Sequence, residues 1–497
     1  MAVVAVWTFV RLDLAPYDDA LFFLRFADNA VEHGVFAWNP DDGPVYGNTA
    51  QLWQLLVAGL RLAFADHMVL AGRLMSAVAL VTAGLLLPRR HAPATLLAFA
   101  SPVALATVVS GMETAVALAL GAAFLRALAG ERDNSLLLTI LAVLLWLARP
   151  DSLLLSLPSL VLAERRRWRA LALSVAAVGV GMGLLHLAYG TPVPLSFLVK
   201  SGLSPLTDPH FLSISRMGKL RHSAMFLVTA VPLLWMAGGR RTARWWGPAL
   251  LFCIWHLTMT VDVMGLHARF YAPALPWLAL AAASGDRRCG VGPVVAVAGL
   301  VALGLSADLL PGNRGWAIGR VGGWTWGAAV ATVGLATLPH IPRRTAAIVG
   351  VLLAGVLLDH GAVPNTRLSD RAYVARLQKQ ATSWRGLSQL ARCLGPELHV
   401  YHSEIGVVGA RLPEARVTDL GGLMNAEQTL HGLDFEAACQ RDRPEAIFLP
   451  HRNYRALNAE IADGECIRDY VRVVEKGSSP LHVRRDLAAD FACAPRL

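Results

Sequence analysis

Two adjacent carboxylates near the start of the chain, Asp18 and Asp19, are the residues whose type and spacing most directly suggest chemistry. They open a stretch of helical periodicity that runs to about His33. A carboxylate in the first turn of a helix meets free backbone N–H groups, so helix capping is one interpretation of the pair. The other is that the adjacent carboxylates provide a general base or a cation ligand.

The residues that follow the pair are more polar than helix packing requires. Phe22, Arg25 and Asn29 follow Asp18 at helical spacing, so one face of this helix carries an acidic, an aromatic, a basic and an amide side chain. Basic residues also occur outside the centres of the apolar runs: Lys200 lies in the segment between two runs, and Arg269 begins one.

The elements that must position these residues are predicted to lie in a membrane. The 497 residues are 55% hydrophobic and only 16% charged, with a mean hydropathy of +0.48. Residues 68–358 are almost wholly apolar and are interrupted by short clusters of basic residues, whereas residues 365–497 have the composition of an ordinary soluble domain. We therefore predict a polytopic α-helical membrane domain over residues 1–360, including a loop at 12–67, and a soluble α/β domain over residues 361–497.

The apolar runs predict about 13 membrane spans. Met1–Val10 is too short to cross a hydrocarbon core, which needs about 20 residues, and favours a truncated start for the first span. The other predicted spans are 68–88, 92–109, 112–130, 134–148, 152–163, 170–190, 222–238, 244–262, 269–285, 291–310, 322–339 and 344–358.

Clusters of arginine between the spans set the predicted orientation. Each cluster falls on the cytoplasmic side if the N-terminus is inside, loop 12–67 is outside and Thr49–Phe64 is an interfacial helix that does not cross. The C-terminal domain is then extracytoplasmic. Because the basic residues are distributed as in cytoplasmic loops, the formal charge of +10 does not indicate nucleic-acid binding.

The C-terminal region is predicted to combine a helix over Arg371–Cys393 with strands over 398–401, 416–419, 446–449 and 470–474. Its four cysteines, Cys393, Cys439, Cys466 and Cys493, predict up to two disulfides in an oxidising compartment, with the pairing left open. No pair has metal-binding spacing, and the strand period places His399 and His402 on opposite faces. We predict no metal site there.

Several short motifs occur in an order that resembles one family. They are Asp18-Asp19, Arg25-Phe26-Ala27, Asn29, His33-Gly34, Asn39-Pro40, Gly47-x-Thr49-x-x-Leu52-Trp53, Gly111-Met112-Glu113-Thr114, Arg149-Pro150-Asp151, Pro194-x-Ser196-Phe197-x-x-Lys200, Arg269-Phe270 with Pro273 and Pro276, and Asp419-Leu420-Gly421-Gly422-Leu423. The set resembles the polyprenyl-phosphate-dependent GT-C glycosyltransferases, and within them the terminal β-(1→2)-arabinofuranosyltransferase-like branch.

Two motifs depart from that branch. The branch has Gly-Tyr-Thr-Asn where this chain has Gly47-Asn48-Thr49-Ala50, and Pro-Asn-Thr-Phe-Tyr where it has Pro194-Leu195-Ser196-Phe197-Leu198. Because these residues are expected to line the sugar pocket, the departures leave the sugar open, arabinofuranose included, while the reaction class is unaffected.

The resemblance implies an enzyme of the bacterial plasma membrane. It would move a sugar from a polyprenyl-phosphate donor to an extracytoplasmic glycan, lipid or protein acceptor, with inversion. Asp18 or Asp19 would be the general base, and Lys200 and Arg269 would bind the donor phosphate. We expect the remaining polar residues of the outer segments to bind substrate: Arg25, Asn39, Thr49, Trp53, Glu113, Arg149, Asp151 and His267.

Other interpretations remain at this stage. A transporter or flippase of lipid-linked sugars would also have many spans, but it predicts mid-membrane charges and related halves that the sequence does not show. A non-catalytic envelope scaffold would tolerate loss of the aspartate pair. Structural roles also exist for single residues: Lys200 and Arg269 as interfacial anchors, Glu113 as a helix cap, and Arg149–Asp151 as a turn.

Overall fold

The computed structural model describes residues 18–87, 92–99, 101–130, 134–164, 167–201, 204, 216–260, 268–285, 370, 374, 386–450, 454–474 and 480–491. The chain divides into two compact units. We call Met1–Leu14, Leu70–Gly181 and Arg216–Leu368 the helical unit, and Ala15–Val69, Met182–Ser215 and Ser369–Leu497 the mixed unit. In this division the first loop falls in the same unit as the C-terminal domain.

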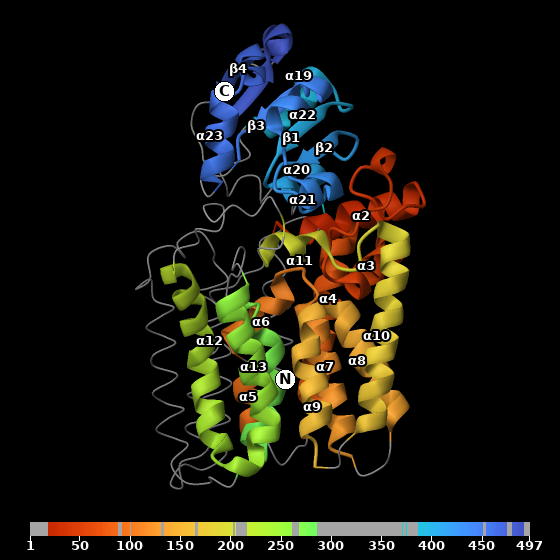
Figure 1. Cartoon of the computed structure of the whole chain (residues 1–497), viewed down its shortest axis with the longest axis vertical. Helices are drawn as coiled ribbons and strands as arrows, with labels where there is room; N and C mark the ends of the chain where they lie inside the picture. The colour runs from red at the N-terminus through yellow and green to blue at the C-terminus, as the bar shows by residue number, and fades with distance from the viewer. Residues whose placement is uncertain are drawn as a thin grey trace. The chain divides into compact units, whose positions relative to one another are not determined.

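The described part of the helical unit consists of helices, most of which run side by side (Figure 1). α4 enters it from the mixed unit and α10 leaves it. The helices are α4 (Met68–Leu86), α5 (Ala92–Phe99), α6 (Pro102–Val109), α7 (Thr114–Leu128), α8 (Ser135–Ala148), α9 (Leu153–Leu162), α10 (Trp168–Tyr189), α12 (Arg216–Ala237), α13 (Ala243–Met259) and α14 (Leu275–Ala283).

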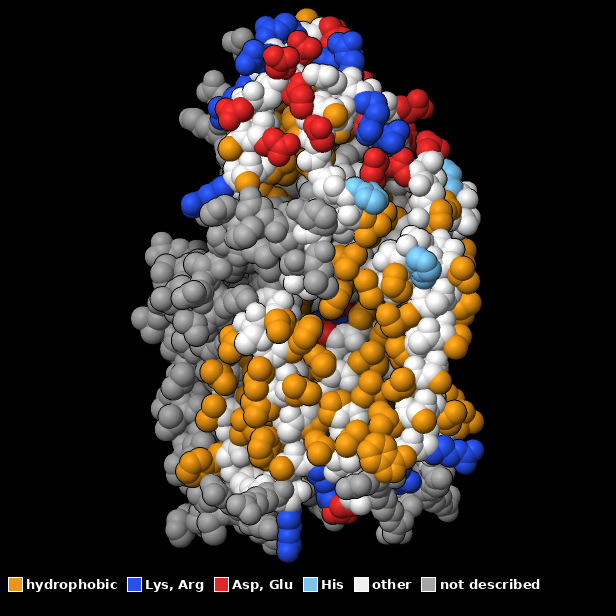
Figure 2. Space-filling model, viewed as in Figure 1, with side chains coloured by type: hydrophobic (Ala, Val, Ile, Leu, Met, Phe, Trp, Pro, Cys, Tyr) orange, Lys and Arg blue, Asp and Glu red, His pale blue; other side chains and the backbone are white. Residues whose placement is uncertain are grey.

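The outward faces of these helices are apolar. Val180 on α10 is 65% exposed, Leu136 on α8 is 69% exposed, and Val231 on α12 is 51% exposed. Figure 2 shows hydrophobic side chains over most of the visible face of the described helices. Two helical runs, Gln51–Leu86 and Trp168–Tyr189, are long and apolar enough to cross a membrane. A continuous apolar exterior of this kind suits lipid and would be a liability in water.

The interior of the helical unit is closely packed around Trp277 on α14. A side-chain Cβ at Gly121 on α7 would lie 2.7 Å from the indole ring, so glycine permits the two helices to approach. Phe124 stacks on the same indole with ring centroids 6.3 Å apart, and the indole N–H donates to Ser159 Oγ at 2.8 Å.

One predicted span is interrupted. Residues 92–109 form two helices because Pro102 starts α6, and the Ser101 side chain accepts a hydrogen bond from the Ala104 N–H as its N-cap. The predicted segments 1–10, 291–310, 322–339 and 344–358 lie outside the described residues, as does most of the helix predicted at 371–393.

In the mixed unit, the first loop forms α2 (Ala20–Glu32), the short 3-10 turn η1 (Pro40–Asp42) and α3 (Gln51–Phe64). α3 corresponds to the helix predicted at 49–64. It ends at Ala65, whose φ of 44° breaks the helical run before the 3-10 turn η2 (Ala65–His67) and α4. A further short helix, α11 (Leu195–Lys200), is joined to the loop by a hydrogen bond from the Leu195 N–H to the Tyr46 carbonyl.

The C-terminal domain contains a five-stranded sheet in the order β2-β1-β3-β5-β4. β1 (His399–His402) pairs in parallel with β2 (Arg416–Asp419) and β3 (Ala446–Phe448), whereas β5 (Leu481–Arg484) is antiparallel to β3 and to β4 (Tyr470–Val474). The described helices of the domain are α19 (Leu387–Leu394), α20 (Ile405–Arg411), α21 (Ala426–His431), α22 (Phe435–Asp442), α23 (Arg455–Asp463) and α24 (Ala488–Phe491).

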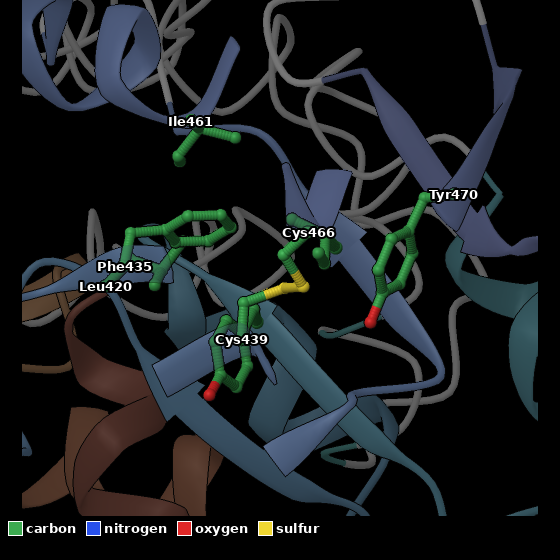
Figure 3. Close-up of a cluster of buried hydrophobic side chains, with 8 residues drawn as sticks. Leu420, Phe435, Cys439, Ile461, Cys466 and Tyr470 are labelled. Carbon is green, nitrogen blue, oxygen red and sulfur yellow. A yellow bond between two sulfur atoms is a disulfide. The ribbon is translucent and has the colours of Figure 1, made fainter. Parts of the chain in front are cut away.

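A disulfide between Cys439 and Cys466 lies in the core of this domain (Figure 3). The buried side chains of Leu420, Phe435 and Ile461 belong to the same cluster. Cys393 is disulfide-bonded as well. The bonded cysteines are therefore among the four that the sequence assigns to an oxidising compartment.

Candidate functional site

Asp18 lies two residues before the start of α2 and is buried, with 4% of its surface exposed. Its Oδ1 accepts a hydrogen bond of 2.7 Å from the backbone N–H of Val407 in α20. Asp19 is the residue that precedes the first turn of α2, and its side chain makes no capping hydrogen bond there. The aspartate pair therefore does not cap its own helix, and Asp18 contacts the C-terminal domain instead.

Several ionisable groups surround Asp18. Burial and the neighbouring Asp19 raise the pKa of Asp18 to about 7, although the backbone N–H groups of Val407 and Gly406 act in the opposite direction. Burial together with Asp18, Asp19 and Asp419 raises the pKa of Glu404 to about 8. A carboxylate with a pKa near neutrality is matched to general-base catalysis at neutral pH.

Arg25 makes a different set of contacts from those expected of a substrate ligand. Its guanidinium donates five hydrogen bonds within the protein, so every N–H of the group has an acceptor. The acceptors are the carbonyls of Trp38, Gly409, Leu412 and Ala415 and the side-chain oxygen of Asn39. Arg25 thereby joins α2 to the end of α20, and the two helices pack against each other (Figure 1).

Asn39, also predicted to bind substrate, pairs with the backbone of Val417 in β2. Its side chain accepts from the Val417 N–H at 3.0 Å and donates to the Val417 carbonyl at 3.2 Å. The indole N–H of Trp38 donates to the same carbonyl at 2.8 Å. Trp38 and Asn39 thus bind the edge strand of the sheet, as a neighbouring strand would.

Two of the sequence motifs meet in the mixed unit. The carboxylate of Asp419 accepts hydrogen bonds from the N–H groups of Gly421 at 2.8 Å and Met424 at 3.0 Å, which holds the turn that follows β2. That turn packs against Gly47, where a Cβ would lie 2.8 Å from the Leu423 carbonyl oxygen and would also overlap Met424. The glycine of one motif is needed for the close approach of the other.

The remaining predicted residues of the mixed unit lie near α3 and α11. Thr49 is half-buried just before α3, and Lys200 is the half-buried last residue of α11. Trp53 on α3 is 1% exposed, and its indole N–H has no acceptor among the described residues.

In the helical unit, three predicted residues form one buried charged network. Arg149 donates to Glu113 Oε1 at 2.9 Å and to both carboxylate oxygens of Asp151, at 3.2 and 2.7 Å. Gly111, two residues before Glu113, has a φ of +74°, a backbone conformation that favours glycine. Glu113 makes no side-chain cap on α7, so its contact with Arg149 replaces the capping role considered from the sequence.

His256 extends this network and was not singled out by the sequence analysis. Its Nε2 donates to Asp151 Oδ2 at 2.9 Å, and its ring stacks on Phe270 with centroids 5.7 Å apart. The Phe270 ring also lies 5.2 Å from the guanidinium carbon of Arg269 and 5.8 Å from that of Arg149. The usable signal was an ionisable residue in the interior of the predicted span 244–262. His267 lies outside the described residues.

An apolar cavity of about 870 Å³ adjoins the network. It lies among α12, α13 and α14, and its lining includes Phe226, Leu234, Trp246, Ile254 and Tyr271. Tyr271 connects the two features, because it follows Arg269-Phe270 in the chain and its ring makes an edge contact with that of His256 at 6.0 Å. Tyr271 is therefore the residue through which the cavity lining contacts the network.

Within the part of the chain that the structure describes, no group of three or more histidine, cysteine, aspartate or glutamate side chains is arranged to hold a metal ion. The acidic groups near Asp18 do not form such a set.

Comparison with known proteins bears on the fold. No family model matches the chain, and no curated protein matches it in sequence. Two crystal structures of ArnT from Cupriavidus metallidurans match it over 100% of this chain and 98% of theirs. The apo structure has a TM-score of 0.54 at 15% identity, and the structure bound to undecaprenyl phosphate has a TM-score of 0.57 at 14% identity.

The chain has the fold of ArnT. This is the GT-C membrane fold expected from the sequence motifs, and the likeness to ArnT covers both units of the chain. The comparison does not bear on the arabinofuranosyltransferase-like branch.

Proposed function

We propose that this protein is a membrane glycosyltransferase that takes its sugar from a polyprenyl-phosphate carrier and transfers it to a hydroxyl of an envelope acceptor. The observation that carries the proposal is the full-length likeness to an ArnT structure that holds undecaprenyl phosphate. The motif resemblance makes arabinofuranose the first sugar to test. A bacterial plasma-membrane location follows from the same likeness.

The helical unit supplies features that suit a lipid phosphate. A polyprenyl chain needs an apolar space, and the cavity among α12, α13 and α14 has the required character. The phosphate needs cations, and Arg269 follows closely in the chain after α13 and directly precedes the cavity residue Tyr271. As the sugar leaves, negative charge develops on the phosphate, so a fixed guanidinium stabilises the transition state more than the ground state.

The mixed unit supplies the proposed base. An acceptor hydroxyl attacks the anomeric carbon, the bond from that carbon to the phosphate oxygen breaks, and the hydroxyl proton passes to the carboxylate of Asp18. A pKa of about 7 favours this transfer, since the group is substantially ionised at neutral pH yet basic enough to take the proton. Asp19 acts on Asp18 through its charge and is proposed to orient the acceptor. Lys200 is proposed as a second phosphate ligand.

The proposed orientation places the C-terminal domain outside the cell. The Cys439–Cys466 disulfide supports this, because structural disulfides persist in oxidising compartments and are rare in the cytosol.

The test is transfer of labelled sugar from a lipid-linked donor by the purified protein, with Asp18→Asn and Asp19→Asn examined separately. Asp18→Asn should reduce kcat by about a hundredfold or more, because an amide cannot accept the proton. Asp19→Asn should retain transfer but move the acidic limb of the pH profile to lower pH, because the charge that raises the pKa of Asp18 is gone.

Asp41→Asn provides a matched control, since Asp41 is an exposed aspartate of the same loop. It should behave as the wild type. Undiminished turnover in Asp18→Asn would remove Asp18 from the role of base, and absence of transfer from any polyprenyl-phosphate sugar would overturn the proposed reaction.

A further inference from the structure

α20 lacks a cap of its own. It begins directly after Glu404, whose side chain makes no capping hydrogen bond. The N–H of the third helical residue, Val407, is a donor that an N-cap side chain usually satisfies. Here it is satisfied by the carboxylate of Asp18, from the first loop of the chain.

This contact depends on the absence of a side chain at Gly406. A Cβ there would lie 2.6 Å from Asp18 Oδ1 and would overlap the Asp18 carbonyl oxygen as well. Gly409, one turn further on, faces the loop in the same way, with a Cβ position 2.7 Å from Trp38 Cζ2 and 3.1 Å from Arg25 Cδ. The glycine face of α20 thus brings backbone N–H groups within reach of Asp18.

The contact between Asp18 and α20 lies at the carboxyl end of the parallel strands of the sheet. β1 ends at His402, and α20 follows it almost at once, so Asp18 packs beside the carboxyl end of a parallel strand. In open α/β sheets, ligands bind outside the carboxyl ends of the parallel strands. The favoured point lies where the chain connections of two adjacent strands lead to opposite sides of the sheet. β1 lies between β2 and β3, so the C-terminal domain has such a point, and the carboxyl end of its β1 faces the first loop.

We propose that the C-terminal domain completes the catalytic site, with Gly406 and Val407 as positioning residues for the carboxylate of Asp18. The inference rests on the proposed role of Asp18 as base. Val407 holds one carboxylate oxygen in place, and this fixes the orientation in which the carboxylate is proposed to accept the proton of the acceptor hydroxyl. The membrane helices alone would then be inactive.

The pH dependence of the reaction should report this contact. The groups near Asp18 are Asp19 beside it, Glu404 ahead of α20, and Tyr454 ahead of α23, with Asp419 acting on the latter two. The Gly406 and Val407 N–H groups favour the ionised carboxylate, whereas burial and Asp19 disfavour it. Weakening these two hydrogen bonds while Asp18 stays buried should therefore raise the pKa of Asp18 further and move the acidic limb of activity to higher pH.

The variant Gly406→Ala in the full chain tests the proposal. We expect kcat at pH 7 to fall about tenfold and the acidic limb to move up by about half a pH unit or more, with KM for the lipid donor little changed. Because alanine favours helix more than glycine does, a loss cannot be assigned to a weakened α20. Arg411→Ala, at an exposed position of the same helix, should leave both values unchanged.

Hydrogen exchange of the peptide containing Val407 provides a readout that does not need turnover. In Asp18→Ala the Val407 N–H loses its acceptor and should exchange faster than in the wild type. An unchanged rate would overturn the contact. Wild-type transfer with a wild-type pH profile in Gly406→Ala would overturn the positioning role while leaving the proposed function intact. Faster exchange in Asp18→Ala, combined with no transfer by the wild type, would overturn the proposed function and with it the catalytic role of the contact.

Discussion

Asp18 and Arg25 lie on one helical stripe of the first loop, yet their environments differ in kind. The Arg25 guanidinium has all its N–H groups occupied by protein acceptors, so no donor is left for a ligand. Asp18 has one oxygen held by Val407 and a pKa shifted to about 7. Of the polar residues in this stripe, Asp18 is therefore suited to proton transfer and Arg25 to holding the loop against the domain.

His256 leads to a residue-level prediction. His256→Phe removes a buried hydrogen-bond donor to Asp151. The free energy of unfolding should fall by about 1–3 kcal/mol, and both the thermal midpoint and the transfer rate should be lower. His256→Gln retains an N–H donor of similar reach and should restore most of the loss. Thermal unfolding in detergent and the transfer assay would measure both effects.

His186→Phe is a suitable control, because this histidine is exposed on α10. Equal effects of phenylalanine and glutamine at position 256 would contradict a role for the hydrogen bond to Asp151.

The sequence could identify Glu113, Arg149 and Asp151 as candidates because each lies where an apolar run begins or ends. It could not show that one guanidinium joins both carboxylates, since that depends on how α7, α8 and α9 pack. His256 was missed for a related reason. Within an apolar span, a lone histidine has no sequence signal that identifies its partner.

At the scale of elements, the contact of α2 with α20 is stabilised chiefly by Arg25. Arg25→Lys should weaken this contact by about 3 kcal/mol or more. A lysine ammonium cannot reach all the acceptors that surround the planar guanidinium, so buried carbonyl groups would lose their hydrogen bonds. Limited proteolysis should then release the C-terminal domain faster than in the wild type.

The matched variant is Arg61→Lys, at the ion pair of α3 with Asp28 and Glu32, which is only partly buried. It should change proteolysis little, since exposed pairs contribute about 0–1 kcal/mol. If Arg25→Lys also left the cleavage rate unchanged, Arg25 would not be the residue that holds the two elements together.

Most described helices of the helical unit could be predicted, whereas the helices α20 to α24 of the C-terminal domain were not. Strands β1 to β4 follow the predicted runs, whereas β5 (Leu481–Arg484) was missed although it alternates apolar and polar residues. The break at Ser101-Pro102 was missed because hydropathy alone does not register a cap and a proline inside an apolar run.

For the whole molecule, three buried carboxyl groups predict how stability varies with pH. The pKa is raised to about 7 for Asp18 and Asp419 and to about 8 for Glu404, chiefly by burial. In the unfolded chain these groups ionise near pH 4. The folded state therefore binds more protons between about pH 4 and pH 8, so its stability should fall as pH rises through this range.

Thermal unfolding at pH 5 and pH 8 would check this expectation. The midpoint should be lower at pH 8, and Glu404→Gln should reduce the difference, because the amide has no proton to lose. A midpoint that rose from pH 5 to pH 8 would show that other ionisable groups dominate.

The pairing of Trp38 and Asn39 with Val417 has a consequence for the C-terminal domain in isolation. β2 is an edge strand, and without the first loop its backbone N–H and carbonyl groups at Val417 would face water and other molecules. A fragment that begins at residue 369 should therefore self-associate through this uncovered strand, and addition of a peptide spanning residues 36–42 should keep it monomeric.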